Sequence, residues 1–484
     1  MPDVILVNPL GLKVVGDKTM PMGLLCVSSY ASKDFNIKII DQRFEKKWKQ
    51  LLLEGIKSNP LCVGVTSLTG KQILSALEIA STVKKHSSIP VVLGGVHPTF
   101  LPEETIKDPL VDILIEGEGD ISFHELLKKL SSNASIENIP GIWYKDYGKI
   151  KKGPPPVPVD ITRLPPIPYE LIDINKYIEN GNYGRTLSVF TSRGCPNRCT
   201  FCYNVKFFDC KWKGFSVKRC LDEITNFIKS YRIEHIQFMD DNFFADIERG
   251  KEIITKMYEK NPGITWSVFG IHVKTVLQMD LNFLKLLEEY GCKIFNIGSE
   301  SGSEKILKLL NKGFTKEDLL ECNRHMYKTN IKPSYSFIVG FPDETDADIK
   351  DTIDIVFRLK EENPNVIYGS IKPFVSFPGT ALYSLCLKKG FTPPDTLKKW
   401  GNYSWHNYLK IDIPWADRKK RQWLSDLYFT SIVMNPDHLF VRSKVFKFIV
   451  KFMKPSMEKR VKTLKVGTFP LIARTLSFIQ NHIL

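Results

Sequence analysis

The chain has 484 residues, 43% of them hydrophobic and 25% charged, a composition typical of a soluble globular protein with two or three domains. Its first residues lack the basic segment and apolar core of an export signal, and no apolar run approaches 18 residues, so neither secretion nor a membrane-spanning helix is predicted. Ten cysteines without such a signal indicate a reducing cytosol. The net charge is +15, but residues 441–484 carry ten Lys or Arg against one acid, so most of the excess belongs to the tail.

Short apolar runs alternate with helical patterns over residues 3–130. Near-continuous Val, Ile and Leu strands separated by helices predict a parallel, doubly wound sheet of the Rossmann or flavodoxin-like kind, which we assign to residues 1–138. The predicted strands are 4–7, 37–40, 62–65, 91–93 and 112–115. Ligands of such sheets bind at the carboxyl ends of the strands, so the residues just after each run are candidates for binding. Among them, Gly94 and Gly95 would let a ligand approach the backbone closely.

Residues 139–184 are predicted to be a linker. A hairpin-like turn at 146–148 is followed by a proline-rich stretch at 154–158, which cannot form regular structure. The domain boundary is therefore expected here.

A second series of strands and helices follows, over residues 185–392. The predicted strands are 187–191, 235–239, 265–269, 293–297, 334–339 and 367–373. Six such units predict a partial (β/α)6 barrel, similar to an open TIM barrel, with its active site at the carboxyl ends of the strands.

Three cysteines lie just after the first of these strands, at Cys195, Cys199 and Cys202. Thiolates so close in sequence can converge on one soft metal centre, and iron-sulfur clusters are held at similar short spacings. Three ligands would leave one iron of a four-iron cluster open for catalysis. A zinc site is the alternative, with Cys210, Cys220 or His235 as the fourth ligand.

Further motifs follow other strands of the second series. Asp240 and Asp241 follow the second strand, where we interpret them as helix caps or as support for the cysteine loop. Residues 298–301 follow the fourth strand and 340–342 the fifth, and a turn at 376–383 follows the sixth. In a barrel all of these would lie on the same rim as the cysteines.

The remainder, residues 393–484, is predicted to be mainly helical and is rich in aromatic residues. These aromatic side chains could orient a substrate, but packing between domains is the simpler interpretation. Residues 441–453 have the pattern of a basic amphipathic helix, which suits either a membrane surface or a helix docked on the barrel.

The cysteine spacing, with Phe201 before the last cysteine, resembles the signature of the radical S-adenosylmethionine (SAM) family. The resemblance implies a [4Fe-4S] cluster on Cys195, Cys199 and Cys202 whose open iron chelates SAM. The cluster would cleave SAM to methionine and a 5′-deoxyadenosyl radical. The residues implied to bind SAM are Phe201, Tyr203, Gly298, Ser299, Glu300, Ser301, Gly340 and Pro342.

The first domain resembles the cobalamin-binding domain that precedes many radical SAM barrels. The residues implied to bind cobalamin are Asn8, Gly23, Leu24, Ser67, Leu68, Thr69, Gly94, Gly95, Val96, His97, Glu116, Gly117, Glu118 and Gly119. Many cobalamin domains carry a cobalt-ligating His in the loop after the first strand, but the loop from 8 to 22 has none. We therefore expect a lower cobalt face without a His from this loop, which suits methyl transfer. His97 is interpreted as a contact at the cofactor's edge or as a cap on its loop, in preference to a cobalt ligand.

These resemblances imply a cobalamin-dependent radical SAM enzyme, a methyltransferase acting on an unactivated carbon after the 5′-deoxyadenosyl radical removes a hydrogen. One alternative is an anaerobic radical cyclase or oxidoreductase acting on a tetrapyrrole-like or lipid-like substrate. Another is a cobalamin or redox sensor without turnover. The expected partners are a small-molecule, lipid, tetrapyrrole or peptide substrate and an external electron donor. Nucleic acid is not expected, because no binding module or stacking platform is seen. The expected location is the cytoplasm, with contact to a membrane surface through the basic tail as a further expectation.

Overall fold

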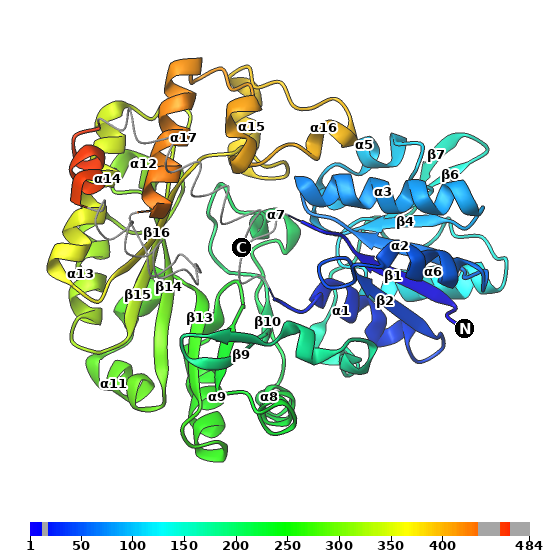
Figure 1. The fold of residues 1–484 in the computed structure, drawn as a ribbon, viewed down its shortest axis with the longest axis horizontal. Helices are drawn as coiled ribbons and strands as arrows, with labels where there is room; N and C mark the ends of the chain where they lie inside the picture. Colours follow the sequence, from blue (N-terminus) through cyan, green and yellow to red (C-terminus); the bar gives the residue numbers. More distant parts are fainter. Residues whose placement is uncertain (12–17, 434–454, 465–484) are drawn as a thin grey trace.

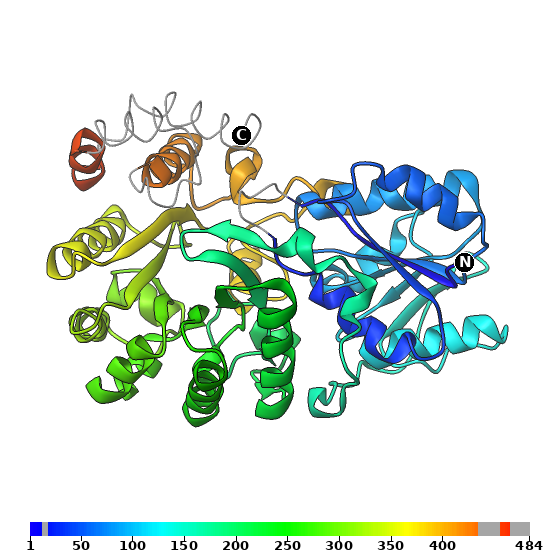
Figure 2. The same cartoon turned by 60° about the horizontal axis from the view of Figure 1, so that its bottom comes forward.

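The computed structural model describes residues 1–11, 18–433 and 455–464 of the chain. Two sheets lie side by side, each covered by helices (Figures 1 and 2). The first sheet belongs to the N-terminal part of the chain and the second to the middle part, as the alternation of apolar runs and helical patterns predicts.

The first sheet has the strand order β2-β1-β3-β4-β5-β6-β7. Its five parallel strands are β1 (Val4–Asn8), β2 (Ile37–Asp41), β3 (Cys62–Thr66), β4 (Val91–Gly94) and β5 (Ile113–Ile115). The connecting helices are α1 (Met22–Ala31), α2 (Trp48–Ile56), α3 (Lys71–His86), α4 (Val96–Phe100), α5 (Pro102–Lys107) and α6 (Asp120–Ser131). Helices α1 and α6 pack together on one face, while α2 and α3 pack together on the other. This doubly wound order confirms the predicted fold. The strand order reverses between β1 and β3, and such sheets bind ligands at the point of reversal.

The first sheet continues beyond the boundary expected at residue 138. The predicted hairpin turn joins two antiparallel strands, β6 (Ile142–Asp146) and β7 (Lys149–Lys152), and β6 pairs with β5. The first part of the predicted linker is therefore an edge of the sheet. Helix α6 connects β5 to β6, whereas β6 and β7 are joined by a short turn, which antiparallel pairing permits.

The second sheet has the order β16-β15-β14-β13-β12-β9-β8. Its six parallel strands are β9 (Gly184–Val189), β12 (His235–Phe238), β13 (Thr265–Ile271), β14 (Cys292–Glu300), β15 (Lys332–Val339) and β16 (Ile367–Pro373), and β8 (Glu179–Gly181) is antiparallel at the edge. The helices between them lie on the outside of the curled sheet (Figure 2). They are α8 (Val217–Tyr231), α9 (Ile247–Lys260), α10 (Val273–Gln278), α11 (Leu281–Glu289), α12 (Glu304–Leu309), α13 (Lys316–Met326) and α14 (Asp346–Glu362). The predicted partial barrel is confirmed.

Side chains alternate across this sheet, as the pleat requires. Trp266 and Val268 are completely buried, and Trp266 packs against Phe244 and Phe295 on the outer, helix-covered side. The intervening residues of β13 therefore face the inner, concave side.

The C-terminal region bridges the two domains. Helices α15 (Ala381–Lys388), α16 (Leu397–Trp400) and α17 (Arg418–Val433) follow the last strand; α17 packs on β16 and α16 packs on α3. The fully buried Trp400 donates its indole N-H to Glu104 of the first domain at 2.6 Å. Aromatic packing between domains is thus confirmed for Trp400.

The basic amphipathic segment predicted at 441–453 lies outside the described residues. Within the described part of the chain, the helices are too short or too polar to cross a bilayer.

Candidate active site between the two domains

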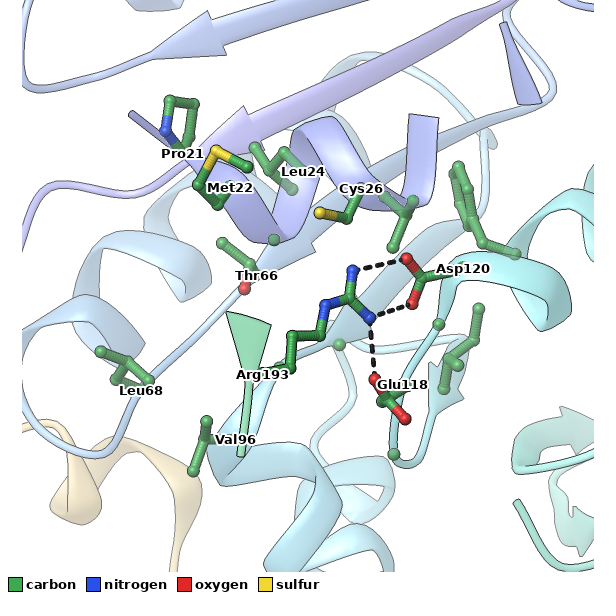
Figure 3. A pocket seen from close by; sticks show the side chains of 18 of the residues that line it. Pro21, Met22, Leu24, Cys26, Thr66, Leu68, Val96, Glu118, Asp120 and Arg193 are labelled. Atoms are coloured by element: carbon green, nitrogen blue, oxygen red, sulfur yellow. Dashed lines mark hydrogen bonds and ion pairs between the residues drawn. The ribbon is translucent and has the colours of Figure 1, made fainter. Parts of the chain in front are cut away.

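A cavity of about 480 Å³ lies where the carboxyl ends of the first sheet face the second domain (Figure 3). Ten of the residues implied to bind cobalamin line it: Asn8, Gly23, Leu24, Leu68, Gly94, Gly95, Val96, Gly117, Glu118 and Gly119. Its opposite wall comes from the second domain and includes Arg193, Tyr203, Phe207 and Phe208 beside the cysteine loop. Of the residues implied to bind SAM, Tyr203 is the one among the described residues lining this cavity, and the three cysteines do not line it. The cavity thus reaches the flank of the cysteine loop.

Glycines give this cavity its floor. Gly95 has φ +102°, and a Cβ there would lie 2.7 Å from Thr66 Oγ1 and 2.9 Å from the Ser67 carbonyl oxygen. Only glycine adopts this turn without strain. At Gly23 a Cβ would meet no atom within 4 Å, so the space above it is open to a ligand.

Four of the implied cobalamin residues, Ser67, Thr69, His97 and Glu116, are not among the described residues lining this cavity. The imidazole Nδ1 of His97 lies 2.9 Å from Thr69 Oγ1, and its ring meets Trp400 edge-on at 5.6 Å between centroids. Burial lowers the pKa of His97 to about 3, so the ring is neutral. Glu116 accepts the indole N-H of Trp143 at 2.9 Å. His97 therefore contacts Thr69 on the side of the loop away from the cavity. This agrees with the prediction that it caps its loop, and not with a contact at the edge of the cofactor.

Arg193 links the domains at the wall of the cavity and is not among the site residues predicted from the sequence. Its guanidinium pairs with Glu118 at 2.8 Å and, with two N-H groups, with Asp120 at 2.8 and 3.1 Å (Figure 3). The side chains of Arg193, Glu118 and Asp120 are only 18%, 11% and 3% exposed. Because more than 70 residues separate the partners in sequence, no local pattern could have revealed the pair.

The cysteine loop is held in a conformation that presents its thiols to one region. Gly194, with φ +80°, starts the loop, and a Cβ there would lie 2.1 Å from the Lys211 carbonyl oxygen. The Asn197 side-chain amide approaches Cys195 Sγ at 3.4 Å. Burial raises the pKa of each thiol, that of Cys202 to about 12, and mutual repulsion with Cys199 adds to this rise. A cationic metal centre would reverse this effect, since it binds thiolates.

Asp240 and Asp241 support this loop and do not cap a helix. The completely buried Asp240 accepts hydrogen bonds from the backbone N-H and hydroxyl of Thr191, at 3.0 and 2.8 Å, and from the Ser192 hydroxyl. Asp241 accepts from the Tyr203 hydroxyl at 3.1 Å. Burial raises the pKa of Asp240 to about 6, although the hydrogen bonds oppose the shift.

The residues considered as a fourth zinc ligand have other contacts. The Nδ1 atom of His235 lies 2.8 Å from Thr265 Oγ1, and the His235 ring stacks on Tyr183. Cys220, in helix α8, accepts a hydrogen bond from the guanidinium of Arg249 in helix α9. In the described ranges, no three His, Cys, Asp or Glu side chains come close enough to hold a single metal ion. A four-iron cluster instead spreads its cysteine ligands over separate iron atoms.

Glu300 has an uncommon backbone conformation at the end of strand β14. Its φ is +66°, a region that residues with a Cβ rarely adopt and that is enriched at active sites. Its carboxylate accepts from the Ser336 hydroxyl at 3.3 Å and lies 3.7 Å from the Lys312 amine. Lys312 is 4% exposed, and its amine lies 5.8 Å from the centre of the Phe201 ring. Sequence reasoning missed Lys312, whose only signal is a basic residue in the loop after α12.

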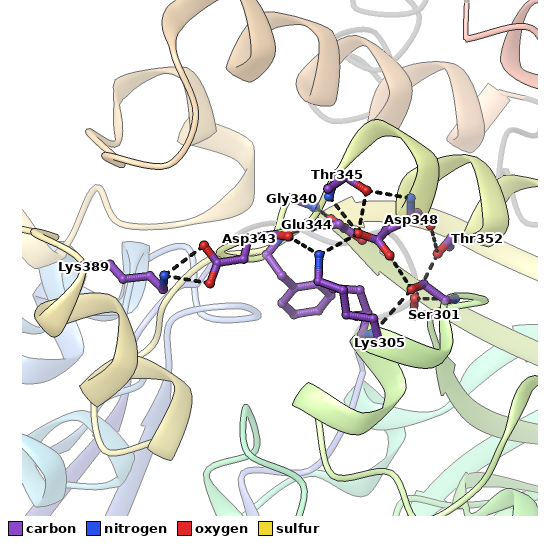
Figure 4. Close-up of polar contacts among 12 residues, drawn as sticks. Ser301, Lys305, Gly340, Asp343, Glu344, Thr345, Asp348, Thr352 and Lys389 are labelled. Carbon is purple, nitrogen blue, oxygen red and sulfur yellow. Dashed lines mark hydrogen bonds and ion pairs between the residues drawn. The ribbon is translucent and has the colours of Figure 1, made fainter.

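The other residues of the predicted SAM motif at the end of β14 have structural contacts. Ser301 is fully buried, 2.9 Å from the Thr352 hydroxyl of α14 (Figure 4). Nearby, Asp348 accepts hydrogen bonds from Ser303 at 2.7 Å and Lys305 at 3.0 Å. Ser299, also fully buried, donates to the Ser336 carbonyl at 2.5 Å, and Gly298 lies next to the Glu300 carboxylate. This network fixes the loop that holds Glu300.

The loop after β15 is fixed in a similar way. Glu344 accepts backbone N-H groups of Gly340 and Phe341, the latter at 3.1 Å, and Trp415 donates to the Gly340 carbonyl at 3.0 Å. Gly340 has φ +89°, and Pro342 next to it is buried. The turn after the last strand is also structural: Gly379 abuts the Phe100 ring of the first domain.

Comparisons with known proteins agree with this geometry. Residues 189–356 match the model of the radical SAM superfamily, and residues 10–127 match that of the B12 binding domain. An uncharacterized methyltransferase of Pyrococcus horikoshii is 30% identical over 405 residues, covering 83% of this chain and 84% of that protein.

Two solved structures share the fold. The radical SAM methyltransferase TsrM from Kitasatospora setae, with cobalamin and a [4Fe-4S] cluster bound, aligns with a TM-score of 0.66 and 21% identity, over 80% of this chain and 78% of that one. The cobalamin-dependent radical enzyme OxsB, with aqua-cobalamin and SAM bound, aligns with a TM-score of 0.68 and 20% identity, over 100% of this chain and 81% of that one. The chain therefore belongs to the radical SAM superfamily, in the group whose barrel follows a B12-binding domain.

Proposed function

We propose that this protein is a cobalamin-dependent radical SAM methyltransferase that methylates an unactivated carbon. The observation that carries the proposal is the shared cavity, whose floor is the glycine loops of the first domain and whose wall continues into the cysteine loop. Tyr203 belongs to both, because it lines the cavity and directly follows Cys202. Two cofactors bound there would face each other.

The residues present fit the three groups. Three thiols in one loop, that of Cys199 buried and those of Cys195 and Cys202 half-buried, suit a cluster with an open iron. Glu300 with its Lys312 partner offers polar groups beside that loop. The open space above Gly23 and Gly94 suits a large, flat ligand. When bound, the cluster would supply the electron that cleaves SAM, and cobalamin would carry the methyl group.

The cobalamin side of the proposal favours methyl transfer. None of the described residues lining the cavity is a histidine, and the neutral His97 is turned toward Thr69. A lower cobalt face without a histidine disfavours tight retention of a methyl group. The enclosing aromatic residues Phe207, Phe208 and Phe215 would limit the access of water to a radical.

The proposal also assigns each cofactor to a part of the chain and the reaction to a cellular compartment. Cobalamin-binding residues would come from 1–138, extended by β6 and β7, and the barrel from 185–392, with 393–484 closing over both. The reaction would take place in the cytoplasm and would need an external electron donor. Contact of the basic tail with a membrane surface stays a prediction.

Product analysis tests the proposal. Protein reconstituted without oxygen with iron, sulfide and cobalamin is given SAM and reductant, and 5′-deoxyadenosine and S-adenosylhomocysteine are quantified. We expect both products from the wild type and no 5′-deoxyadenosine from Cys199→Ala. Formation of 5′-deoxyadenosine without S-adenosylhomocysteine would favour a radical cyclase, and cofactor binding without either product would favour a sensor.

A further inference from the structure

The inner face of the second sheet carries both polar and apolar side chains, since Ile294 and Ile338 pair in register with Ser267 and Lys372. Ser267, Asn296 and Ser336 lie on this face, and each is buried or half-buried. Phe269 of β13 points inward, opposite to the buried Val268, and is 57% exposed. Phe269 is therefore free to contact an apolar part of a ligand bound on this face. Lys372 of β16 is exposed and pairs in register with Ile338. The preceding residue, Ile371, is buried on the opposite face, and its backbone N-H donates to the Ser431 hydroxyl of α17.

Lys372 is a cation without a matched acid. The ion pairs among the described residues include none to Lys372, and the charge that acts on it is that of Glu300, which already pairs with Lys312. Its amine lies 5.4 Å from the centre of the Trp405 ring, which belongs to the C-terminal region. Desolvation of the amine lowers the pKa of Lys372, although the charge of Glu300 opposes this shift. An anion at this point would restore the lost solvation.

We propose that Lys372 and Trp405 form the subsite that binds an anionic group of the substrate, a carboxylate or a phosphate, while Phe269 contacts an apolar part of the same molecule. This inference rests on the proposed function, since it assigns the substrate of that site. Strands β13 and β16 are separated by three inter-strand spacings of about 4.8 Å, and the register places Lys372 about four residues further along the strands than Phe269, so the two positions are about 19 Å apart along the sheet. The substrate is thus an amphipathic anion of about that length.

SAM is the other source of a carboxylate in this barrel. Its implied contacts include Glu300, whose charge acts on Lys372, and Gly340 in the loop after the neighbouring strand β15. Lys372 also contacts Trp405 of the C-terminal region. The two sources predict different effects of the same substitution.

The test uses Lys372→Gln and Lys372→Arg, with Lys332→Gln as the matched control, because Lys332 is an exposed lysine at the start of the neighbouring strand β15. Thermal unfolding of each cluster-loaded and cobalamin-loaded protein is followed while phosphate or succinate is titrated at constant ionic strength. We expect both anions to raise the midpoint of the wild type, Lys372→Arg and Lys332→Gln. In Lys372→Gln the half-saturating concentration should rise at least tenfold.

Equilibrium dialysis of SAM against the same variants completes the test. SAM affinity within twofold of the wild type in Lys372→Gln supports a substrate subsite, and a tenfold loss would overturn it in favour of the SAM carboxylate. An equal anion response in all four proteins, or none, would also overturn the proposal. Cluster and cobalamin absorbance report folding, and none of these readouts needs methyl transfer. A failure of the proposed methyltransferase function can therefore be distinguished from a failure of the proposed anion subsite.

Discussion

The buried ion pair between the domains gives the sharpest quantitative prediction. Replacing Arg193 by Met removes the cation from this pair. Glu118 and Asp120, whose side chains are only 11% and 3% exposed, are then left without a positive partner. Removing one partner of a buried pair costs about 3–5 kcal/mol, because the remaining charge is left uncompensated. We therefore expect Arg193→Met to lower the free energy of unfolding by about this amount, or to weaken cobalamin binding by roughly 100-fold or more if only the domain contact opens.

Urea unfolding and absorbance titration with cobalamin would measure these two effects. Arg198→Met is the matched control, because Arg198 is exposed beside the same loop, and it should stay within about 0.5 kcal/mol of the wild type. A triple variant that also carries Glu118→Gln and Asp120→Asn leaves no unpaired charge and should recover most of the loss. If Arg193→Met lies within 1 kcal/mol of the wild type in unfolding and binds cobalamin equally well, the pair does not hold the domains together.

Three further predictions address single residues. Gly95→Ala would place a Cβ 2.7 Å from Thr66 Oγ1 at φ +102°, so we expect at least tenfold weaker cobalamin binding by absorbance titration; unchanged affinity would contradict the assigned floor of the cavity. Burial raises the pKa of Asp240 to about 6 from an ordinary 3.8, so folding disfavours its charge and the wild type should lose up to about 3 kcal/mol of stability as pH rises from 4 to 6. Asp240→Asn should abolish this loss, and parallel stability curves for the two proteins would show the reasoning to be wrong. Lys312→Gln should weaken SAM binding about tenfold or more in equilibrium dialysis, because Glu300 loses its buried partner; equal affinity would exclude this role.

The strands of both sheets could be predicted because each is a short apolar run with a helical pattern after it. The observed bounds differ from the predicted ones by a few residues at most, as for β14, which extends to Glu300. The edge strands β6 and β7 were assigned to a linker instead, because β7, Lys149–Lys152, is exposed along its whole length and has no apolar pattern.

The site was harder to predict in detail, since a motif names a loop but not the direction of its side chains. Ser301 and His97 belong to the expected motifs, yet one bonds to Thr352 and the other to Thr69, behind the loops they stabilise. Arg193 shows a second limit. Its partners lie in another domain, and only the folded chain brings them together.

Cobalamin content tests the central claim most directly, namely that the cavity between the domains is a cobalamin site facing the cysteine loop. Wild type, Cys199→Ala and Gly23→Phe would be reconstituted with cobalamin, desalted and measured by absorbance, with circular dichroism as the check on folding. The open space above Gly23 would be filled by the phenyl ring. We predict about one cobalamin per chain in wild type and Cys199→Ala, and none in folded Gly23→Phe. Equal cobalamin content in all three proteins, or no binding by the wild type, would contradict the account.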